Sequence, residues 1–401
     1  MLAPGFFVEQ LRSHGIDFYA GVPDSLLKSF CAYLAENIDP SRNIITANEG
    51  GAVALAAGHY LASGRPGCVY MQNSGQGNAI NPLASLTDAD VYGIPLLMLI
   101  GWRGRPGVHD EPQHVKQGKV TLSLLETMGI PYAVLSADAS IAENQIAEAC
   151  KALSSGQVYA LVVEKNTFEV QPVEVQPVHP NELKAVPILS LSREEAIRTV
   201  ASALAPSDIV VSSTGMISRE LFEYREATGA GHGHDFLTVG SMGHASQIAL
   251  GIALERPDRR VWCFDGDGAA IMHMGAMAIV GTKAGSNFVH VVFNNGAHDS
   301  VGGQPTVGLQ IDLPAIARAC GYRSVYSVSS HEEVQSVLNQ TVNLNGLNPK
   351  SSSPEGGLAD SVGPVFIEIK VRKGNRPDLG RPTTTPQQNK EAFMEFLNIR
   401  K

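Results

Sequence analysis

The chain has 401 residues, of which 44% are hydrophobic and 17% are charged; this composition is typical of a folded globular protein and excludes a chain that is disordered throughout. Its 39 acidic residues outnumber its 30 basic ones, for a formal net charge of −9, which argues against a nucleic-acid partner because that binding relies on a basic surface. The amino-terminal segment lacks the basic region and long apolar run of a secretory signal, and the longest apolar run, 94–100, is far too short to cross a membrane, so we expect neither secretion nor a membrane partner.

In the first part of the chain, short apolar runs alternate with amphipathic stretches. Buried strands are predicted by the glycine-bounded or similarly apolar runs 67–71, 94–101 and 159–165. Helices are predicted by the amphipathic stretches 23–37 and 137–153. Because apolar strands separated by helices are what a parallel sheet covered on both faces requires, we predict an α/β domain over residues 1–169.

A proline-rich stretch interrupts this alternation. Residues 170–187 contain four prolines and show no helical period, which indicates an extended and rather stiff connector. We therefore place a domain boundary here, with the linker at 170–188.

After the linker the alternation of helices and strands resumes. The stretch 192–204, SREEAIRTVASAL, begins with a capping-box pattern and predicts a helix. Buried strands are predicted by the apolar runs within 209–213, 259–268, 287–295 and 364–371. We therefore predict a second α/β domain over 189–401, so that each of two domains is a mainly parallel sheet covered by helices on both faces. The stretch 343–364, rich in Gly, Ser, Pro and Asn, is expected to be a surface loop without chemistry.

The segment 261–300 contains the most chemical information. A predicted strand ends at the tripeptide GDG (266–268), a helix follows, and the next predicted strand ends at Asn294 and Asn295. Successive βα units of a parallel sheet place their strand ends at the same carboxyl edge, where ligands bind. We therefore expect Asp267 and Asn295 to converge on one ligand.

Two other interpretations of the glycine-rich turn fail. A dinucleotide-binding fingerprint needs a third glycine where this chain has Ile271, and an aspartate in the turn repels a bare pyrophosphate. A calcium loop of the EF-hand type needs oxygen ligands where this chain has Ala269 and Ala276. The remaining interpretation is a Mg2+ site in which Asp267, the Asn295 side-chain oxygen and a loop carbonyl hold an ion that neutralises a diphosphate.

The pairing of GDG with NN resembles the cofactor motif of the thiamine diphosphate (ThDP) enzymes, and the 25 residues between them, 269–293, match the spacing in that family. The resemblance implies two cofactors, ThDP and Mg2+. It implies as metal ligands the carboxylate of Asp267, the side chain of Asn295 and the backbone carbonyl of Ala297. A chance turn is the alternative for the tripeptide alone, and the asparagine pair at the next strand end argues against it.

Glu49 precedes a stretch rich in glycine and alanine within 45–64. This pattern resembles the glutamate that ThDP decarboxylases place against N1′ of the aminopyrimidine ring. A carboxyl group hydrogen-bonded to N1′ shifts the ring toward its imino tautomer, and N4′ can then take the C2 proton of the thiazolium. The alternative is that Glu49 merely stabilises the dipole of its helix.

Further cofactor contacts follow from the same resemblance. Met242 matches the bulky apolar residue that forces the cofactor into a V shape, and Gly240 matches the residue whose carbonyl accepts a hydrogen bond from the N4′ amino group, with Ser241 between them. Plain core packing is the alternative for Met242. Backbone N–H groups that we expect to contact the diphosphate are those of Thr214, Gly215, Gly268 and Ala269.

The chain is shorter than most ThDP decarboxylases because a connector replaces their middle domain. This architecture resembles the family of short decarboxylases that act on phosphonopyruvate or sulfopyruvate. Segments resembling the phosphonopyruvate group in particular are 21–30, 101–118, 240–246, 294–306 and 376–386. The resemblance implies a carboxy-lyase that converts 3-phosphonopyruvate into phosphonoacetaldehyde and CO2 in phosphonate biosynthesis. The alternatives are a sulfopyruvate decarboxylase, another short 2-oxo-acid decarboxylase or carboligase, a catalytically silent binding subunit, and a nicotinamide-dependent oxidoreductase.

A substrate with two anionic groups needs cations near the cofactor. Arg103 and Arg105 follow a predicted strand at its carboxyl end, and planar guanidinium groups suit a phosphonate. The alternative is that they are solvated surface cations. Arg376 and Arg381 compete for the same role.

Loss of CO2 must be followed by protonation, and three residues are candidates for that catalytic step. Asp24 in GVPDS matches an acid in related decarboxylases, and His114 and His298 are expected in loops that face the same sheet edge. Asp24 is the preferred candidate, since most of the 12 histidines are expected to be structural.

The expected position of the cofactor bears on how many chains form the active protein. Because Glu49 and Asp267 lie in different predicted domains, the family resemblance places the cofactor between two chains and implies at least a homodimer.

The cysteines are odd in number, scattered and never in a CxxC pair, so we expect buried thiols in a reducing cytoplasm rather than disulfides or a zinc site. They are Cys31, Cys68, Cys150, Cys263 and Cys320.

Overall fold

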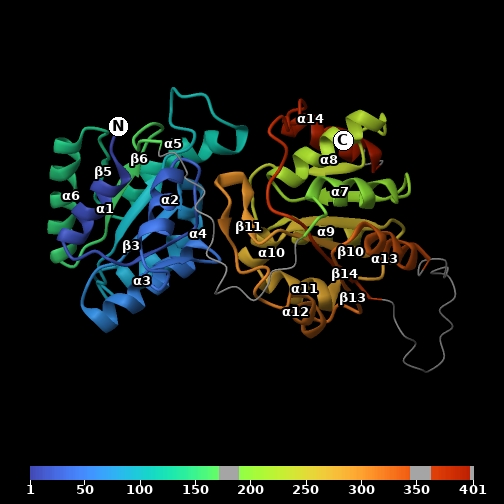
Figure 1. Ribbon diagram of the computed structural model, residues 1–401, viewed down its shortest axis with the longest axis horizontal. Coiled ribbons are helices and arrows are strands. Elements are labelled where there is room, and N and C mark those ends of the chain that lie inside the picture. Colours follow the sequence, from blue (N-terminus) through green and yellow to red (C-terminus); the bar gives the residue numbers. More distant parts are fainter. Residues whose placement is uncertain (171–188, 344–362, 398–401) are drawn as a thin grey trace. The chain divides into compact units, whose positions relative to one another are not determined.

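The computed structural model describes residues 1–170, 189–343 and 363–397. Nearly all of the predicted linker and of the predicted surface loop at 343–364 therefore lies outside the described residues. Contacts divide the chain into two compact units, drawn in Figure 1: the first comprises the described residues of 1–182 with Ser300–Gln304, and the second comprises the others. None of the helices in the described part is both long and apolar enough to cross a membrane.

The first unit is built on a parallel sheet of six strands in the order β2-β1-β3-β4-β6-β5. Its strands are β1 (Tyr19–Gly21), β2 (Asn43–Ile45), β3 (Cys68–Gln72), β4 (Leu97–Gly101), β5 (Tyr132–Val134) and β6 (Tyr159–Val163). Its α-helices are α1 (Pro4–Ser13), α2 (Lys28–Asn37), α3 (Glu49–Ser63), α4 (Gln76–Pro82), α5 (Pro112–Thr127) and α6 (Ala139–Ser154).

Alternate residues of the central strand β4 face opposite sides of this sheet, as the two-residue period of a strand requires. Leu97 and Leu99 pack in one apolar cluster with residues of α1, α2 and α6. Met98 and Ile100 pack in another cluster with residues of α3, α4 and α5. Helices therefore cover both faces of the first sheet.

The second unit repeats this plan with the strand order β13-β14-β10-β9-β7-β8, again fully parallel. Its strands are β7 (Ile209–Ser212), β8 (Asp235–Leu237), β9 (Val261–Gly266), β10 (Phe288–Asn294), β13 (Ser324–Val328) and β14 (Val365–Lys370), and a separate short ladder joins β11 (Ala297–His298) to β12 (Gln304–Pro305). Its α-helices are α7 (Arg193–Ser202), α8 (Met216–Thr228), α9 (Ala245–Glu255), α10 (Asp267–Met272), α11 (Gly275–Lys283), α12 (Leu313–Cys320), α13 (His331–Asn343) and α14 (Pro386–Phe396).

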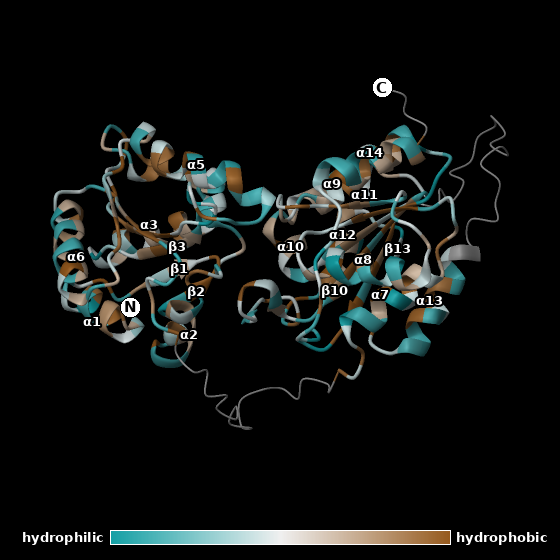
Figure 2. Ribbon diagram, turned by 90° about the horizontal axis from the view of Figure 1, so that it is seen from above, coloured by the Kyte–Doolittle hydropathy of each residue, from teal (hydrophilic) through white to brown (hydrophobic). Residues whose placement is uncertain are grey.

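Two apolar clusters again lie on opposite faces of the second sheet. Trp262 and Phe264 of β9 pack with α7, α8 and α13, whereas Val261 and Cys263 pack with α9, α11, α12 and α14. Figure 2 shows the same arrangement by colour, with hydrophobic strands between helices whose outer faces are hydrophilic. Two α/β units, each with a parallel sheet between helices, confirm the predicted fold class.

One predicted helix begins later than expected. The stretch 23–37 was predicted to be helical throughout, but α2 begins at Lys28 and the preceding residues form a loop. Asp24 in this loop is fully buried, and its Oδ2 accepts a hydrogen bond from the N–H of Leu26 at 2.8 Å. Such a local bond from an aspartate competes with helix formation. The prediction was wrong for these residues, and the loop leaves Asp24 just beyond the end of β1.

A buried ion pair links α8 to β8 and allows a test of stability. Arg225 donates from Nε and Nη2 to the two carboxylate oxygens of Asp235 at 2.8 and 3.0 Å, and the two side chains are 6% and 0% exposed. Arg225→Met leaves this carboxylate buried without its partner, so we expect the free energy of unfolding of the second unit to fall by about 3–5 kcal/mol. Urea unfolding followed by circular dichroism measures the change.

The control for this prediction removes both charges. The double variant Arg225→Met, Asp235→Leu should recover much of the lost stability, because no unpaired charge then remains buried. A single variant as stable as the unaltered protein contradicts the assignment of this pair as a buried structural link.

Candidate functional site

Two neighbouring strands of the second unit bring the GDG turn and the asparagine pair together. β9 and β10 are parallel, with Gly266 paired to Phe293, so Asp267 and Asn295 follow the ends of adjacent strands. The backbone N–H of Asn295 donates a hydrogen bond to the Asp267 carboxylate. The structure thus places side by side two of the residues predicted to bind a metal.

Asp267 is buried, with 2% of its surface exposed. Thr306 donates a short hydrogen bond from Oγ1 to its carboxylate. Burial raises the pKa of Asp267 to about 6, although the Thr306 hydroxyl and backbone N–H groups oppose the shift. Gly308 lies so close that any side chain there would collide with this carboxylate and with the Asn294 amide. A buried carboxylate with a raised pKa is a group that a nearby cation would stabilise.

The two asparagines make different contacts. Asn294 is fully buried, and its Nδ2 donates to the carbonyl of Gly308 at 2.8 Å and to Glu368 Oε1 at 2.7 Å. Asn295 instead donates from Nδ2 to Asp299 Oδ2 at 2.7 Å. Asn294 therefore ties the following loop to β14, whereas Asn295 is tied to Asp299. The amide oxygen of each asparagine accepts one backbone N–H, that of Gly296 for Asn294 and that of Ala297 for Asn295.

The residues at this edge fit Mg2+ by the chemistry of their donor atoms. The carboxylate of Asp267, the amide oxygen of Asn295 and the carbonyl of Ala297 are hard oxygen ligands, which Mg2+ binds together with water and phosphate oxygens. Asn295 Oδ1 accepts one hydrogen bond, from the N–H of Ala297 at 3.1 Å, and an amide oxygen has a second lone pair. These three residues could hold Mg2+, and their role as ligands stays a prediction.

The loops after β7 and β8 meet at the same edge of the second sheet. The N–H of Gly240 donates to Thr214 Oγ1 at 3.1 Å. Gly215, Gly240 and Ser241 have positive φ angles of 99°, 72° and 48°, and a non-glycine residue in that conformation is often found at a ligand site. Met242 follows and is half-buried. The structure therefore brings into contact two of the residues predicted to contact the cofactor, Thr214 and Gly240.

Three further predicted residues lie at the GDG turn. Gly268 and Ala269 are in the first turn of α10, and the ring of His298 packs against Gly268. Burial lowers the pKa of His298. This histidine is therefore neutral at physiological pH.

Glu49 in the first unit is a buried and oriented carboxylate. It begins α3 and is 5% exposed. Its Oε2 accepts a hydrogen bond from Asn78 Nδ2 at 2.7 Å, and a side chain on Gly75 would collide with the carboxyl group. Burial and a side-chain partner distinguish Glu49 from a solvated residue that only stabilises a helix dipole.

Asp24 lies at the carboxyl end of the first sheet. Its Oδ1 accepts a hydrogen bond from Nε2 of Gln72, the last residue of β3, at 2.7 Å. Burial raises the pKa of Asp24, although the hydrogen bonds from Gln72 and Leu26 oppose the shift. Asp24 therefore keeps its proton to higher pH than a solvated aspartate does, which suits a general acid.

The two arginines predicted to bind a phosphonate both have carboxylate partners. Arg103 donates from Nε and Nη2 to Asp110 at 2.8 and 2.5 Å and from Nη1 to Ser25 Oγ at 2.7 Å. Arg105 contacts Glu164 at 2.9 Å, and 47% of its side chain is exposed. Arg103 is thus already neutralised and holds its loop, whereas Arg105 is the more accessible of the two to an anion.

His114 lies in the first turn of α5 and is buried. Burial and the charge of Arg103 lower its pKa to about 4. The ring is therefore neutral at pH 7 and carries no extra proton to donate. Among the three predicted proton donors, Asp24 has the surroundings that best suit the role.

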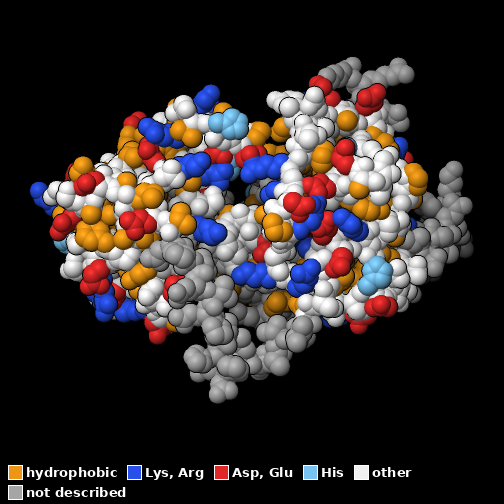
Figure 3. All heavy atoms as spheres, turned by 45° about the horizontal axis from the view of Figure 1, so that its top comes forward, with side chains coloured by type: hydrophobic (Ala, Val, Ile, Leu, Met, Phe, Trp, Pro, Cys, Tyr) orange, Lys and Arg blue, Asp and Glu red, His pale blue; other side chains and the backbone are white. Residues whose placement is uncertain are grey.

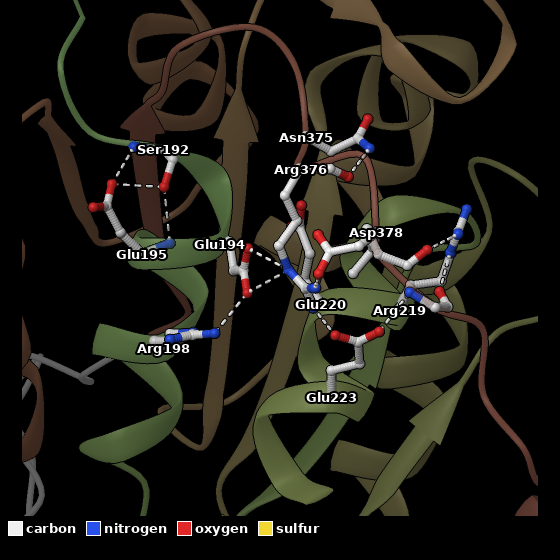
Figure 4. Close-up of polar contacts among 12 residues, drawn as sticks. Ser192, Glu194, Glu195, Arg198, Arg219, Glu220, Glu223, Asn375, Arg376 and Asp378 are labelled. Carbon is white, nitrogen blue, oxygen red and sulfur yellow. Dashed lines mark hydrogen bonds and ion pairs between the residues drawn. The ribbon is translucent and has the colours of Figure 1, made fainter. Parts of the chain in front are cut away.

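Arg376, the competing cation, belongs to a polar network of the second unit (Figure 4). Its guanidinium group contacts carboxylates of Glu194, Glu223 and Asp378. These contacts attach the segment after β14 to α7 and α8. Because three carboxylates surround the guanidinium group, binding of a further anion such as a phosphonate is disfavoured. On the molecular face drawn in Figure 3, acidic and basic side chains are likewise interspersed.

The residues that orient the predicted site residues were not predicted from the sequence. These orienting residues donate to or accept from a site side chain and are Gln72, Asn78, Asp299 and Thr306. Three of them are 29 to 48 residues from their partners along the chain, so no local pattern reveals them. Asp299, four residues from Asn295, was near enough in sequence to have been considered.

The chain matches two descriptions of known protein families. Residues 5–125 match "Thiamine pyrophosphate enzyme, N-terminal TPP binding domain". Residues 213–348 match "Thiamine pyrophosphate enzyme, C-terminal TPP binding domain". The first match includes Glu49, and the second includes Asp267, Asn295 and Ala297.

Curated relatives are similar over nearly their whole length. The phosphonopyruvate decarboxylases of Streptomyces hygroscopicus and Streptomyces viridochromogenes are each 33% identical to this chain, over 99% of it and over 94% and 95% of their own lengths. The sulfopyruvate decarboxylase of Methanosarcina acetivorans is 29% identical over 98% of this chain and 97% of its own length.

Proposed function

The chain belongs to the thiamine pyrophosphate enzyme family and is a carboxy-lyase of the 2-oxo-acid decarboxylase type, and from this premise we propose that it converts 3-phosphonopyruvate into phosphonoacetaldehyde and CO2 with ThDP and Mg2+. The observation that supports this substrate most is the similarity to two phosphonopyruvate decarboxylases from end to end of the chain. The reaction belongs to phosphonate biosynthesis, which we assign to the cytoplasm.

In this proposal each unit supplies a different part of the cofactor site. Asp267, Asn295 and the carbonyl of Ala297 hold Mg2+, and nearby backbone N–H groups contact the diphosphate. When bound, ThDP would supply a nucleophilic carbon and an electron sink for loss of CO2. Glu49 donates or accepts the proton at N1′ of the pyrimidine, with Asn78 fixing the orientation of its carboxyl group.

Residues of the first unit handle the substrate and the proton. Arg105, whose side chain is 47% exposed, binds the phosphonate, and Arg103 supports it through the loop that Asp110 holds. Asp24 supplies the proton that replaces CO2, since burial raises the pKa of its carboxyl group. His114 and, from the second unit, His298 are both neutral and serve as hydrogen-bonding groups near the reacting atoms.

We assign residues 1–169 to a pyrimidine-binding domain, 170–188 to a linker and 189–401 to a diphosphate-binding domain. Because Glu49 and Asp267 belong to different domains, the cofactor has to be shared between them. We propose that the sharing occurs between two copies of the chain, which makes a homodimer the smallest active form.

A substrate comparison tests this proposal. The purified protein is freed of metal, reconstituted with ThDP and Mg2+, and supplied with phosphonopyruvate, sulfopyruvate or pyruvate while release of CO2 is measured. We expect phosphonopyruvate to give the highest kcat/KM. A site built to bind a polar group of its substrate rejects an analogue that lacks this group by about 10⁴- to 10⁵-fold, so the assay separates phosphonopyruvate clearly from pyruvate.

Sulfopyruvate is the second candidate substrate. It is supported by the 29% identity to the Methanosarcina acetivorans enzyme, which is matched over 97% of its length. A higher kcat/KM with sulfopyruvate would replace the first proposal, and a higher value with pyruvate would contradict both.

A further inference from the structure

Asp299 lies where three segments of the second unit meet. Its Oδ2 accepts hydrogen bonds from Asn295 Nδ2 at 2.7 Å, from Arg193 Nη1 at 2.9 Å and from the N–H of Gly374 at 3.0 Å. The side chains of Asp299 and Arg193 are 6% and 5% exposed. A carboxylate this buried would be unfavourable without such partners.

The contact to Asn295 fixes which way that amide faces. A carboxylate can only accept hydrogen bonds, so Asp299 binds the NH2 group of the amide and repels its oxygen. Asn295 Oδ1 is therefore held on the other side, where it accepts from the N–H of Ala297 at 3.1 Å. Removal of the charge on Asp299 would weaken this preference, because an amide oxygen is a weaker acceptor than a carboxylate oxygen and an amide can also turn its NH2 group toward Asn295.

Arg193 in turn holds Asp299. It is the first residue of α7, and it also donates from Nε and Nη2 to the two carboxylate oxygens of Glu220 on α8 at 2.8 and 2.9 Å. The guanidinium group therefore bridges two carboxylates in a fixed plane. Because this cluster contains one cation and two anions, its formal charge is −1, which favours a divalent cation nearby.

We propose that Asp299, held by Arg193, is a positioning residue that orients Asn295 for Mg2+ and thereby sets the affinity of the site for the ion. The proposal rests on the proposed function, in which Asn295 is a metal ligand. It extends that function to a buried network that includes α7, α8 and the segment after β14, none of which carries a predicted metal ligand. Residues that orient metal ligands commonly change metal affinity by about 10- to 100-fold.

The test compares two variants with the same change. Asp299→Asn keeps the size of the side chain and removes its charge, whereas Asp378→Asn makes this change at a residue of the C-terminal segment whose side chain is 79% exposed and contacts Arg376. Calorimetric titration of metal-free protein with Mg2+ at saturating ThDP measures the affinity. Turnover is then measured across Mg2+ concentrations.

We expect Asp299→Asn to weaken Mg2+ binding by about 10- to 100-fold and Asp378→Asn to leave it unchanged. At saturating Mg2+ the turnover of Asp299→Asn should approach that of the unaltered enzyme, since the ligand atoms are still present. Unchanged Mg2+ affinity in Asp299→Asn overturns the proposal, and so does an equal loss in both variants.

A second variant, Arg193→Lys, tests the proposal if Asp299→Asn does not fold. Arg193→Lys keeps the positive charge but not the planar fork that bridges Glu220 and Asp299, so it should weaken Mg2+ binding in the same direction; unchanged affinity overturns the proposal. The unaltered protein provides a separate check on the proposed function. If it binds ThDP equally well without Mg2+, the metal in the proposed function is wrong, irrespective of how the variants behave.

Discussion

Replacing Glu49 with alanine is expected to lower the turnover number by about 10²- to 10⁴-fold, which is the usual contribution of a positioned acid–base group. Glu49 is buried, its Oε2 is held by Asn78, and its carboxyl group packs against Gly75. A carboxyl group in these surroundings can form a hydrogen bond to one ring nitrogen in a fixed direction, and alanine cannot. Steady-state release of CO2 measures the effect.

The variant series should separate chemistry from folding. Glu49→Gln keeps the volume and a hydrogen-bonding group but cannot transfer the proton, so its turnover should also fall while the protein stays folded. Glu36→Ala, at an exposed position of α2, is the control and should behave as the unaltered enzyme. Unchanged turnover in Glu49→Ala would instead support a protein that binds ThDP without using this glutamate.

Asp267→Asn is expected to weaken Mg2+-dependent binding of ThDP by at least about 100-fold, because residues that only orient a metal ligand already contribute about 10- to 100-fold. The substitution keeps the shape of the side chain and removes the one anionic donor of the predicted ligand set. Calorimetric titration with ThDP, with and without Mg2+, measures the loss. Asp258→Asn, at a side chain that is 65% exposed in the same unit, is the matched control.

The pH dependence of binding gives a second test of Asp267. Burial raises the pKa of this carboxyl group to about 6 in the metal-free protein, and a metal binds only the deprotonated form. Affinity for Mg2+ should therefore be full above pH 6 and fall by about tenfold for each unit below it. Affinity that stays constant down to pH 5 would contradict the assignment of Asp267 as a ligand.

The fold was predictable because its strands have a strong and simple signal. Runs such as 94–101 and 287–295 are apolar along their whole length, as strands buried on both faces must be, and they become β4 and β10. The helix after Ser192 was equally clear, since Ser192 and Glu195 form the capping box that the sequence contains. Strands of only three residues, such as β1 (Tyr19–Gly21) and β8 (Asp235–Leu237), are too short to show a pattern.

The site could be predicted where residues follow consecutive strands, and not where partners come from distant segments. Asp267 and Asn295 were placed together correctly because β9 and β10 are neighbours in a parallel sheet. Arg193, by contrast, is 106 residues from Asp299 along the chain, and nothing near either residue indicates the contact. The ion pair between Arg103 and Asp110 was not predicted, because it depends on the conformation of the loop that carries both residues.

The segment after β14 has a consequence for how the protein is made. Gly374 donates its N–H to Asp299, and Arg376 contacts Glu194 and Glu223, so residues near the end of the chain complete a network that begins at α7. On the ribosome these residues emerge after the rest of that network, so the second unit cannot complete the network until they do, whereas the first unit is already available to fold. A premature stop codon just before Gly374 would therefore yield a product that contains every predicted metal ligand. This product would lack the backbone N–H that holds Asp299, the residue that we propose orients Asn295.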